Sequence, residues 1–187
     1  MGQDDSVETW ELADGTKLTL RHIAPTDAAR EQAFVQGLSP QSSYLRFHGT
    51  IKNLSTKDLK RFTEPDSRNE VALIVLRSGE TGEEEIGEAR YVIDSDRANC
   101  EFAIAIADRW QKRGIGTRLM NALISQLQVS GVKQISGSVL KSNVAMRKFS
   151  KQMGFVETNN PDDPSTLLVT KHLGQQASVQ LTNDNRE

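Results

Sequence analysis

Residues 99–117, NCEFAIAIADRWQKRGIGT, constrain the fold of this chain more than any other stretch. Phe102, Ile104 and Ile106 recur at every second position, as in a strand with one buried face. A glycine-containing segment follows, and an apolar pattern with helical spacing begins near Gly114. The stretch therefore predicts a strand, a short connector and the start of a glycine-lined helix.

The other face of this strand carries Glu101, Ala103 and Ala105. One carboxylate among small side chains predicts the floor of a cleft rather than a packed core. The lone Cys100 at the start of the strand is expected to be a small core residue and not a nucleophile.

The glycine-containing segment predicts a site for an anion. Gly114 and Gly116 have no Cβ, so their backbone can lie close to a ligand. The first amides of a helix have no partner within it and lie at the positive end of its dipole. Lys112 and Arg113 add positive charge beside them. We therefore expect a phosphorylated ligand to bind here.

Two common phosphate-binding motifs do not fit this segment. The dinucleotide-binding motif requires a third glycine after G-x-G, where this chain has Leu119. No stretch of the chain reads G-x-x-x-x-G-K-S/T, which excludes a Walker A motif.

Composition narrows the class of protein. The chain has 187 residues, with 36% hydrophobic and 26% charged residues and a net charge of −2, which is typical of one globular domain. We expect no nucleic-acid partner and, without an apolar run of ~20 residues, no membrane partner. Three scattered histidines give no metal-ligand spacing, so no metal is expected. The single cysteine and the lack of a signal peptide predict a cytoplasmic protein.

The order of the predicted elements gives an α+β domain with a mixed sheet. We expect a flexible tail over residues 1–8, one domain over residues 9–173 and a disordered tail over residues 174–187. The acidic run at residues 83–85 is expected to be a solvated hairpin turn. Strands are predicted at 9–12, 17–23, 71–77, 85–93, 102–106, 134–140, from 155 onward and at 167–173, and helices at 26–38, 40–47, 59–62, 114–130 and 143–153.

Four segments resemble a known enzyme family. QKRGIGT (111–117) resembles the Q/R-x-x-G-x-G/A pyrophosphate-binding segment of the GNAT superfamily of acyl-CoA-dependent N-acetyltransferases. NVAMRKFSKQMGF (143–155) resembles a later helix of the same family. Together with SYLRFHG (43–49) and CEFAIAI (100–106), these segments look like the catalytic domain of bacterial Pat-type protein-lysine acetyltransferases. The resemblance covers roughly residues 18–173.

The resemblance implies a GNAT-like fold. This is a mixed, mostly antiparallel sheet of about seven strands flanked by helices, with two central parallel strands splayed to hold acyl-CoA. Acetyl-CoA would be the co-substrate. The residues expected to bind it are Ile104, Ala105, Ile106, Gln111, Lys112, Arg113, Gly114, Ile115, Gly116, Thr117 and Asn143.

Glu101 is the candidate catalytic residue. A lysine-type amine has a pKa near ~10.4, so a base or an ordered water must remove a proton before the amine can attack. The Pat-type resemblance places the family's glutamate at this position. The alternative is a surface glutamate, or one paired with Arg90 or Lys141. Many relatives carry a tyrosine that protonates the departing thiolate where this chain has Ser150, so the resemblance does not extend to that proton donor.

The expected reaction is direct acetyl transfer to a primary amine. Protein lysine is the preferred acceptor because of the Pat-type matches, and a polyamine, an amino acid or an aminoglycoside is the alternative. A non-catalytic acyl-CoA sensor would also retain Gly114 and Gly116. The linear sequence leaves the acceptor and the oligomeric state open.

Overall fold

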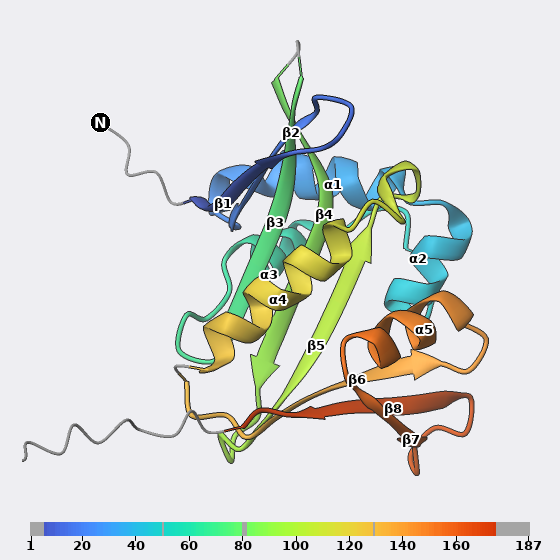
Figure 1. Ribbon diagram of the computed structural model, residues 1–187. Helices are drawn as coiled ribbons and strands as arrows, with labels where there is room; N and C mark the ends of the chain where they lie inside the picture. Colours follow the sequence, from blue (N-terminus) through green and yellow to red (C-terminus); the bar gives the residue numbers. More distant parts are fainter. Residues whose placement is uncertain (1–5, 50, 80–81, 129, 175–187) are drawn as a thin grey trace, which may run out of the picture.

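The computed structural model describes residues 6–49, 51–79, 82–128 and 130–174 of the chain (Figure 1). Its strands form a single eight-stranded sheet in the order β1-β2-β3-β4-β5-β6-β8-β7. The elements are β1 (Ser6–Glu11), β2 (Lys17–His22), η1 (Pro25–Asp27), α1 (Ala28–Gly37), α2 (Pro40–Phe47), α3 (Thr56–Thr63), β3 (Glu70–Gly79), β4 (Gly82–Ile93), β5 (Asn99–Ile106), η2 (Asp108–Trp110), α4 (Ile115–Gln128), β6 (Gln134–Leu140), α5 (Val144–Gln152), β7 (Val156–Asn159) and β8 (Thr166–His172).

The sheet is antiparallel throughout except at one pair of strands. β5 and β6 run parallel, and every other neighbouring pair runs antiparallel. The predicted α+β fold with two central parallel strands is thereby confirmed, with eight strands where about seven were expected.

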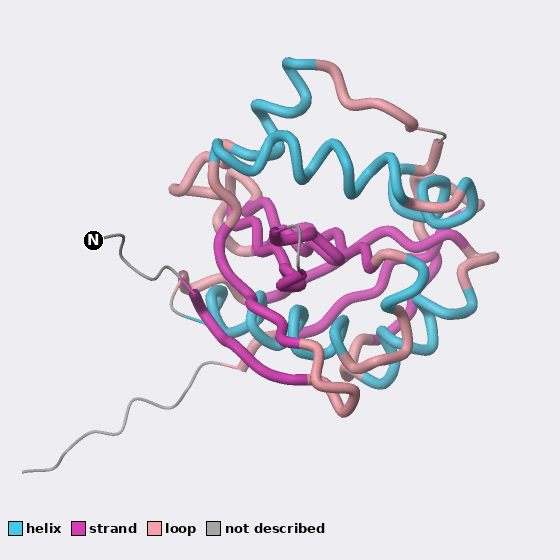
Figure 2. The backbone as a smooth tube through the Cα atoms, turned by 90° about the horizontal axis from the view of Figure 1, so that it is seen from above, coloured by secondary structure: helices cyan, strands magenta, loops and turns pink. Residues whose placement is uncertain are grey.

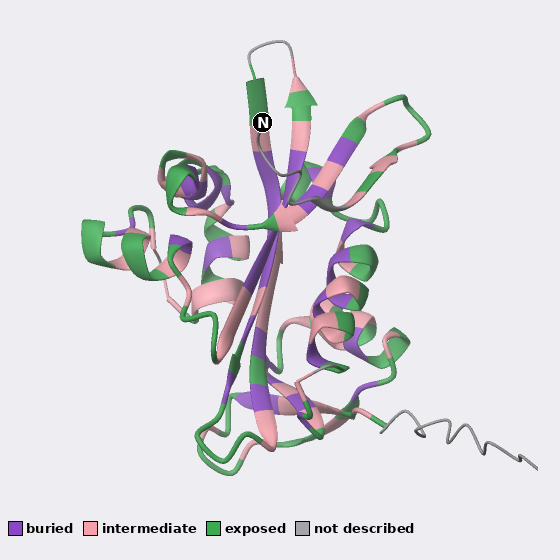
Figure 3. Ribbon diagram, turned by 90° about the vertical axis from the view of Figure 1, so that its left-hand side faces the viewer, coloured by how far each residue is buried: buried purple, intermediate pink, exposed green. Residues whose placement is uncertain are grey.

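Helices cover both faces of the sheet. α4 packs on β3, β4 and β5 from one side, while α1 packs on β4 and α2 on β5 from the other. Figure 2 shows the strands as a layer between helices, and Figure 3 shows that buried residues follow the central strands and the inward sides of the helices. We call the side of β4 and β5 that faces α1, α2 and α3 the acceptor face.

The largest hydrophobic cluster lies between the sheet and α4. The predicted apolar stripe of this helix is buried there, with Ile115, Leu119, Leu123 and Leu127 at helical spacing. Phe102 from β5 packs in the same cluster, and its ring lies 5.2 Å from that of Phe155. The predicted buried face of β5 is therefore the face toward α4.

Several element boundaries differ from the sequence-based expectations. β1 begins at Ser6, so residues 6–8 belong to a strand rather than to the expected tail. The first helical stretch divides into η1 and α1 at Asp27. Residues 1–5 and 175–187 lie outside the described residues. Among the helices that the structure describes, none is both long enough and apolar enough to cross a membrane.

Residues 83–85 lie in a strand and not in the predicted turn, and Glu83 is exposed as expected whereas Glu85 is buried. β4 already begins at Gly82, and Glu85 pairs with Leu76 of β3. A register shift at the next position, between Val75 and Leu76 of β3, places Glu85 and Glu88 on the same face of the sheet. Glu85 is consequently buried beneath α1.

Candidate active site

The site is built around the point where β5 and β6 separate. Their parallel register comprises Asn99 with Gln134, Cys100 with Ile135 and Glu101 with Ser136. Beyond Glu101, β5 continues to pair with β4, and β6 continues to pair with β8. Figure 1 shows the two strands diverging toward α2 and α5. The predicted splay of the central strands is therefore present, and it begins at the candidate catalytic residue.

The backbone of β5 beyond Glu101 directs hydrogen-bonding groups into the splay. The Ala107 N–H donates to the Ile86 carbonyl of β4 at 2.9 Å, so the odd-numbered residues of β5 direct their groups toward β4. Ile104 and Ile106 must then direct their groups toward β6. Ala105 lies between them and packs instead with the cluster beneath α1 and α3.

Gln111 closes part of this open edge. Its Nε2 donates a hydrogen bond of 3.1 Å to the Ile106 carbonyl. The side chain predicted to bind cofactor thus fixes the start of the glycine loop, the name we use for residues 111–117, against the end of β5.

The glycine loop has the backbone geometry expected of an anion site. Lys112 and Gly114 both have positive φ, at 61° and 80°. A Cβ added at Gly114 would meet no heavy atom within 4 Å, so the space beside it is open. The backbone N–H groups of residues 112–117 donate no hydrogen bond to any other described residue. The loop can therefore accept an anion without first breaking an internal bond.

The seven residues of the loop differ in exposure. Gln111, Lys112, Arg113, Gly114 and Thr117 are exposed. Ile115 is buried as the first core residue of α4, so only its backbone is available to a ligand. A Cβ at Gly116 would lie 3.7 Å from the ring of Phe149, an ordinary contact, which fits the family pattern of glycine or alanine there.

One of the two cations that the sequence placed beside the loop already has a partner in the structure. The Arg113 guanidinium pairs with Asp14 at 2.9 Å and lies 4.9 Å from the ring centre of Trp110. Trp110 itself is buried. The turn between β1 and β2 therefore holds this arginine beside the loop, whereas Lys112 forms no ion pair with any described residue.

Glu101 lies on the acceptor face, opposite Phe102. It pairs with Val92 of β4, and its side chain is exposed. Within the part of the chain that the structure describes it forms no salt bridge, and Arg90, one of its expected partners, pairs with Glu88 instead. Its position at the apex of the splay is compatible with the predicted role as a base.

The acceptor face also holds a buried ionic network that sequence reasoning missed. Arg46 of α2 donates to one oxygen of Glu88 from Nε and Nη2, at 3.1 and 2.9 Å. Arg90 donates to the other oxygen at 2.9 Å. The two guanidinium groups lie 4.8 and 4.2 Å from the ring centres of Phe47 and Phe62. The network joins α2 and α3 to β4.

This network makes Glu88 a poor base. Burial by itself raises the pKa of Glu88, but the charges and hydrogen bonds of Arg90 and Arg46 outweigh burial and hold its pKa below the ordinary value. Glu101, on the same face of the sheet, is by contrast exposed. No sequence motif marks Glu88, because its partners lie 42 and 2 positions away.

The remaining predicted positions lie on α5. Asn143 is the N-cap of this helix, and its Oδ1 accepts the Met146 N–H at 3.0 Å. Ser150 is buried, and its Oγ has no hydrogen-bond partner among the described residues. Ser150 therefore lies on the packed side of α5.

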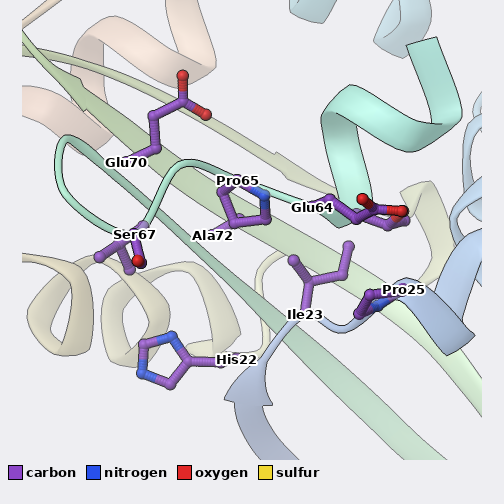
Figure 4. A pocket seen from close by; sticks show the side chains of 10 residues that line it. His22, Ile23, Pro25, Glu64, Pro65, Ser67, Glu70 and Ala72 are labelled. Atoms are coloured by element: carbon purple, nitrogen blue, oxygen red, sulfur yellow. The ribbon is translucent and has the colours of Figure 1, made fainter. Parts of the chain in front are cut away.

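A separate hollow of about 450 Å³ lies away from the splay (Figure 4). The end of β2, the start of β3 and the segment after α3 line it, with Ile23, Glu64 and Ala72 among its residues. It contains none of the predicted site residues. No group of three or more His, Cys, Asp or Glu side chains suited to a metal ion occurs among the described residues.

Known proteins resemble this chain over most of its length. A family model for the acetyltransferase (GNAT) domain matches residues 69–157. An acetyltransferase from Pseudomonas aeruginosa is 31% identical over 157 residues, which is 84% of each chain. Acetyltransferase Pat from Mycolicibacterium smegmatis is 31% identical over 147 residues, or 78% of this chain and 43% of that longer protein.

Solved structures agree with these matches. The GNAT domain of S. lividans PAT superimposes with a TM-score of 0.79 at 25% identity, covering 89% of this chain and 96% of that one. A putative acetyltransferase from Salmonella typhimurium with its cofactor acetyl-CoA gives a TM-score of 0.63 at 16% identity, covering 87% and 96%. The second likeness concerns the fold alone. With its splayed parallel strands, its open glycine loop and these relatives, the chain belongs to the GNAT family of acetyltransferases.

Proposed function

We propose that the chain transfers an acetyl group from acetyl-CoA directly to a primary amine, preferably that of a protein lysine, with Glu101 as the general base. The observation that carries this proposal is the end of the parallel register at Glu101 and Ser136. One exposed carboxylate lies where the strands part, beside the backbone groups that would hold the thioester.

The chain offers three sets of groups to the donor. Free N–H groups of the glycine loop suit the pyrophosphate, with Lys112 and Arg113 beside it. The Ile104 and Ile106 backbone suits the amides of the pantetheine arm, as when a peptide adds to a sheet edge. Asn143, already a helix cap, lies on the other side of the splay and suits the same arm.

Bound acetyl-CoA supplies the activated acyl group, and the chain supplies positioning and proton removal. A backbone N–H of Ile104 or Ile106 is placed to donate to the thioester oxygen. Glu101 accepts the proton of the incoming ammonium group, directly or through one water molecule. Glu88, on the same face, is unsuited to this role because it is buried between two arginines.

The charges on the acceptor face favour a lysine side chain over a polyamine. A polycation is best held by several free carboxylates, but Glu88 is neutralised by Arg46 and Arg90. The neighbouring exposed side chains Tyr44 and Val92 are uncharged. A single amine on a protein surface needs no such acidic cluster. The likeness to the PAT and Pat relatives supports the same choice.

The test is release of CoA from acetyl-CoA, measured with lysine-containing proteins, peptides, polyamines, amino acids and aminoglycosides in parallel. We expect turnover with lysine acceptors, and a fall in kcat of at least ~100-fold in Glu101→Gln with unchanged affinity for CoA. Glu83→Gln is the matched control and should retain activity, because Glu83 is an exposed carboxylate of β4 nine positions from Val92, the residue opposite Glu101.

Two results would overturn the proposal. Binding of CoA without turnover on any amine, unaffected by Glu101→Gln, would identify a sensor. Turnover confined to polyamines or another small amine would move the chain to the alternative acceptor class.

A further inference from the structure

Asp108 connects two parts of the molecule that are far apart in sequence. It is the first residue of η2, between β5 and the glycine loop. Its Oδ2 accepts the Ser39 N–H at 3.0 Å, and its Oδ1 accepts the hydroxyls of Ser39 and Ser42 at 2.7 Å each. We call the end of β5, η2 and the glycine loop the donor side. One carboxylate of the donor side therefore makes three hydrogen bonds to the first turn of α2.

The partners of Asp108 are themselves fixed. Ser39 is the N-cap of α2, and its Oγ accepts the Ser42 N–H at 3.1 Å. Gln111 Nε2 lies 3.5 Å from the Ser42 Oγ while it holds the Ile106 carbonyl. The start of α2, the end of β5 and the glycine loop thus share one hydrogen-bonded junction.

The other end of α2 is attached to the acceptor face. Arg46, in the last turn, forms the buried pair with Glu88, and Phe47 packs in the cluster beneath α1 and α3. α2 is therefore held at its first turn by the donor side and at its last turn by β4. A change at the first turn would tilt a helix whose other end is fixed at the acceptor face.

We propose that Asp108 is a positioning residue that aligns α2, and with it the acceptor face, with the donor bound at the glycine loop. The inference rests on the proposed function for its kinetic consequence. Asp108 touches neither the thioester nor the amine, and it acts through Ser39 and Ser42.

The main variants are Asp108→Ala and Asp108→Asn. The alanine variant loses all three hydrogen bonds, and we expect kcat/KM for the acceptor to fall roughly tenfold or more. The affinity for CoA should change less than about threefold, since the loop's own N–H groups remain. The asparagine variant keeps one acceptor oxygen and should recover part of the loss. Ser42→Ala should weaken acceptor use in the same sense, and its effect should not add to that of Asp108→Ala.

Asp58→Ala is the matched control. Asp58 accepts the hydroxyl of Ser55, the N-cap of α3, at 2.6 Å, but it does not contact the donor side. We expect this variant to retain the wild-type kcat/KM for the acceptor. A thermal melt of each variant would show whether it is folded.

Amide hydrogen exchange separates failure of this inference from failure of the proposed function. In Asp108→Ala the amides of α2 should exchange faster than in the wild type, and in Asp58→Ala they should not. This readout holds even if no amine is acetylated. Unchanged exchange in α2 together with unchanged kinetics would overturn the inference. An equal loss of CoA affinity and of acceptor use would also overturn it, because Asp108 would then belong to the donor site alone.

Discussion

Arg46 and Glu88 form a buried ion pair in which two nitrogens of the guanidinium share one carboxylate oxygen, at 3.1 and 2.9 Å. The other oxygen of Glu88 binds Arg90. α2 is thereby attached to β4 by charge, while its packing contacts are with β5, and one carboxylate joins both arginines.

Removal of this carboxylate should be costly. In Glu88→Ala, Arg46 and Arg90 remain largely buried without a counter-charge, and we expect the free energy of unfolding to fall by ~3 kcal/mol. Urea denaturation would measure the loss. The control is Glu64→Ala, which breaks an exposed pair with Lys60 and should cost ~0.5 kcal/mol or less. Equal losses in the two variants would contradict the assignment.

Stability should fall as pH rises toward 8. Burial, followed by the charge of Glu88, raises the pKa of Glu31 to about 8 from its ordinary 4.5, and burial beside Glu31 also raises the pKa of Glu85. Between the ordinary pKa of 4.5 and the raised pKa of about 8, Glu31 holds a proton in the folded chain but not in the unfolded chain. The free energy of unfolding therefore decreases as pH increases through this range.

The size of this effect can be measured by urea denaturation from pH 5 to pH 8. Each such carboxyl contributes a slope of up to ~1.4 kcal/mol per pH unit. Glu31→Gln keeps the shape of the side chain but does not ionise, so its stability should vary less with pH than that of the wild type. An identical slope in the variant would show that Glu31 does not titrate in this range.

The two glycines of the loop should respond differently to alanine. Gly114 has a φ of 80°, which an alanine adopts only with strain of ~1–2 kcal/mol, and the added methyl group would occupy the space open to a ligand. Gly114→Ala should therefore weaken CoA binding by ~10-fold or more. At Gly116 the new methyl group would make ordinary contacts, so Gly116→Ala should bind CoA nearly as well as the wild type. Calorimetric titration with CoA would compare them, and similar losses would contradict the prediction.

Asp14 should compete with the donor for Arg113. The pair is exposed on both sides, so its contribution is ~1 kcal/mol or less. Asp14→Asn should tighten CoA binding by a few-fold at low salt, because the Arg113 guanidinium then binds a phosphate without first breaking its ion pair with Asp14. The gain should shrink at high salt as the charges are screened. Weaker binding in Asp14→Asn would instead indicate that Asp14 orients Arg113.

The sequence predicted the parts of the site that depend on local pattern. Alternation along β5 gave the two faces of the strand, and the glycines gave the anion loop at the start of α4, because strand period and backbone freedom are properties of neighbouring residues. Asn143 was expected to bind acetyl-CoA from the family resemblance alone, and the structure adds that it caps α5.

The sequence did not predict the contacts that join distant segments. Asp108 meets Ser39 and Ser42 across more than sixty positions, and no periodicity records such a meeting. The acidic run at 83–85 was expected to be solvated because three consecutive acidic residues are typical of exposed loops, yet Glu85, which begins the predicted strand, is buried. Its burial depends on a register shift in β4, and neither residue composition nor alternation reveals where such a shift falls.

The separation of β5 from β6 has a consequence for how two substrates reach each other. Where two strands separate, their free hydrogen-bonding edges lie between the two faces of the sheet, whereas a surface pocket opens on one face only. The glycine loop leads into α4 on one side of the sheet, and Glu101 points to the other side. We therefore expect a large acceptor to bind while the donor is still bound, because the two molecules approach from opposite faces of the sheet.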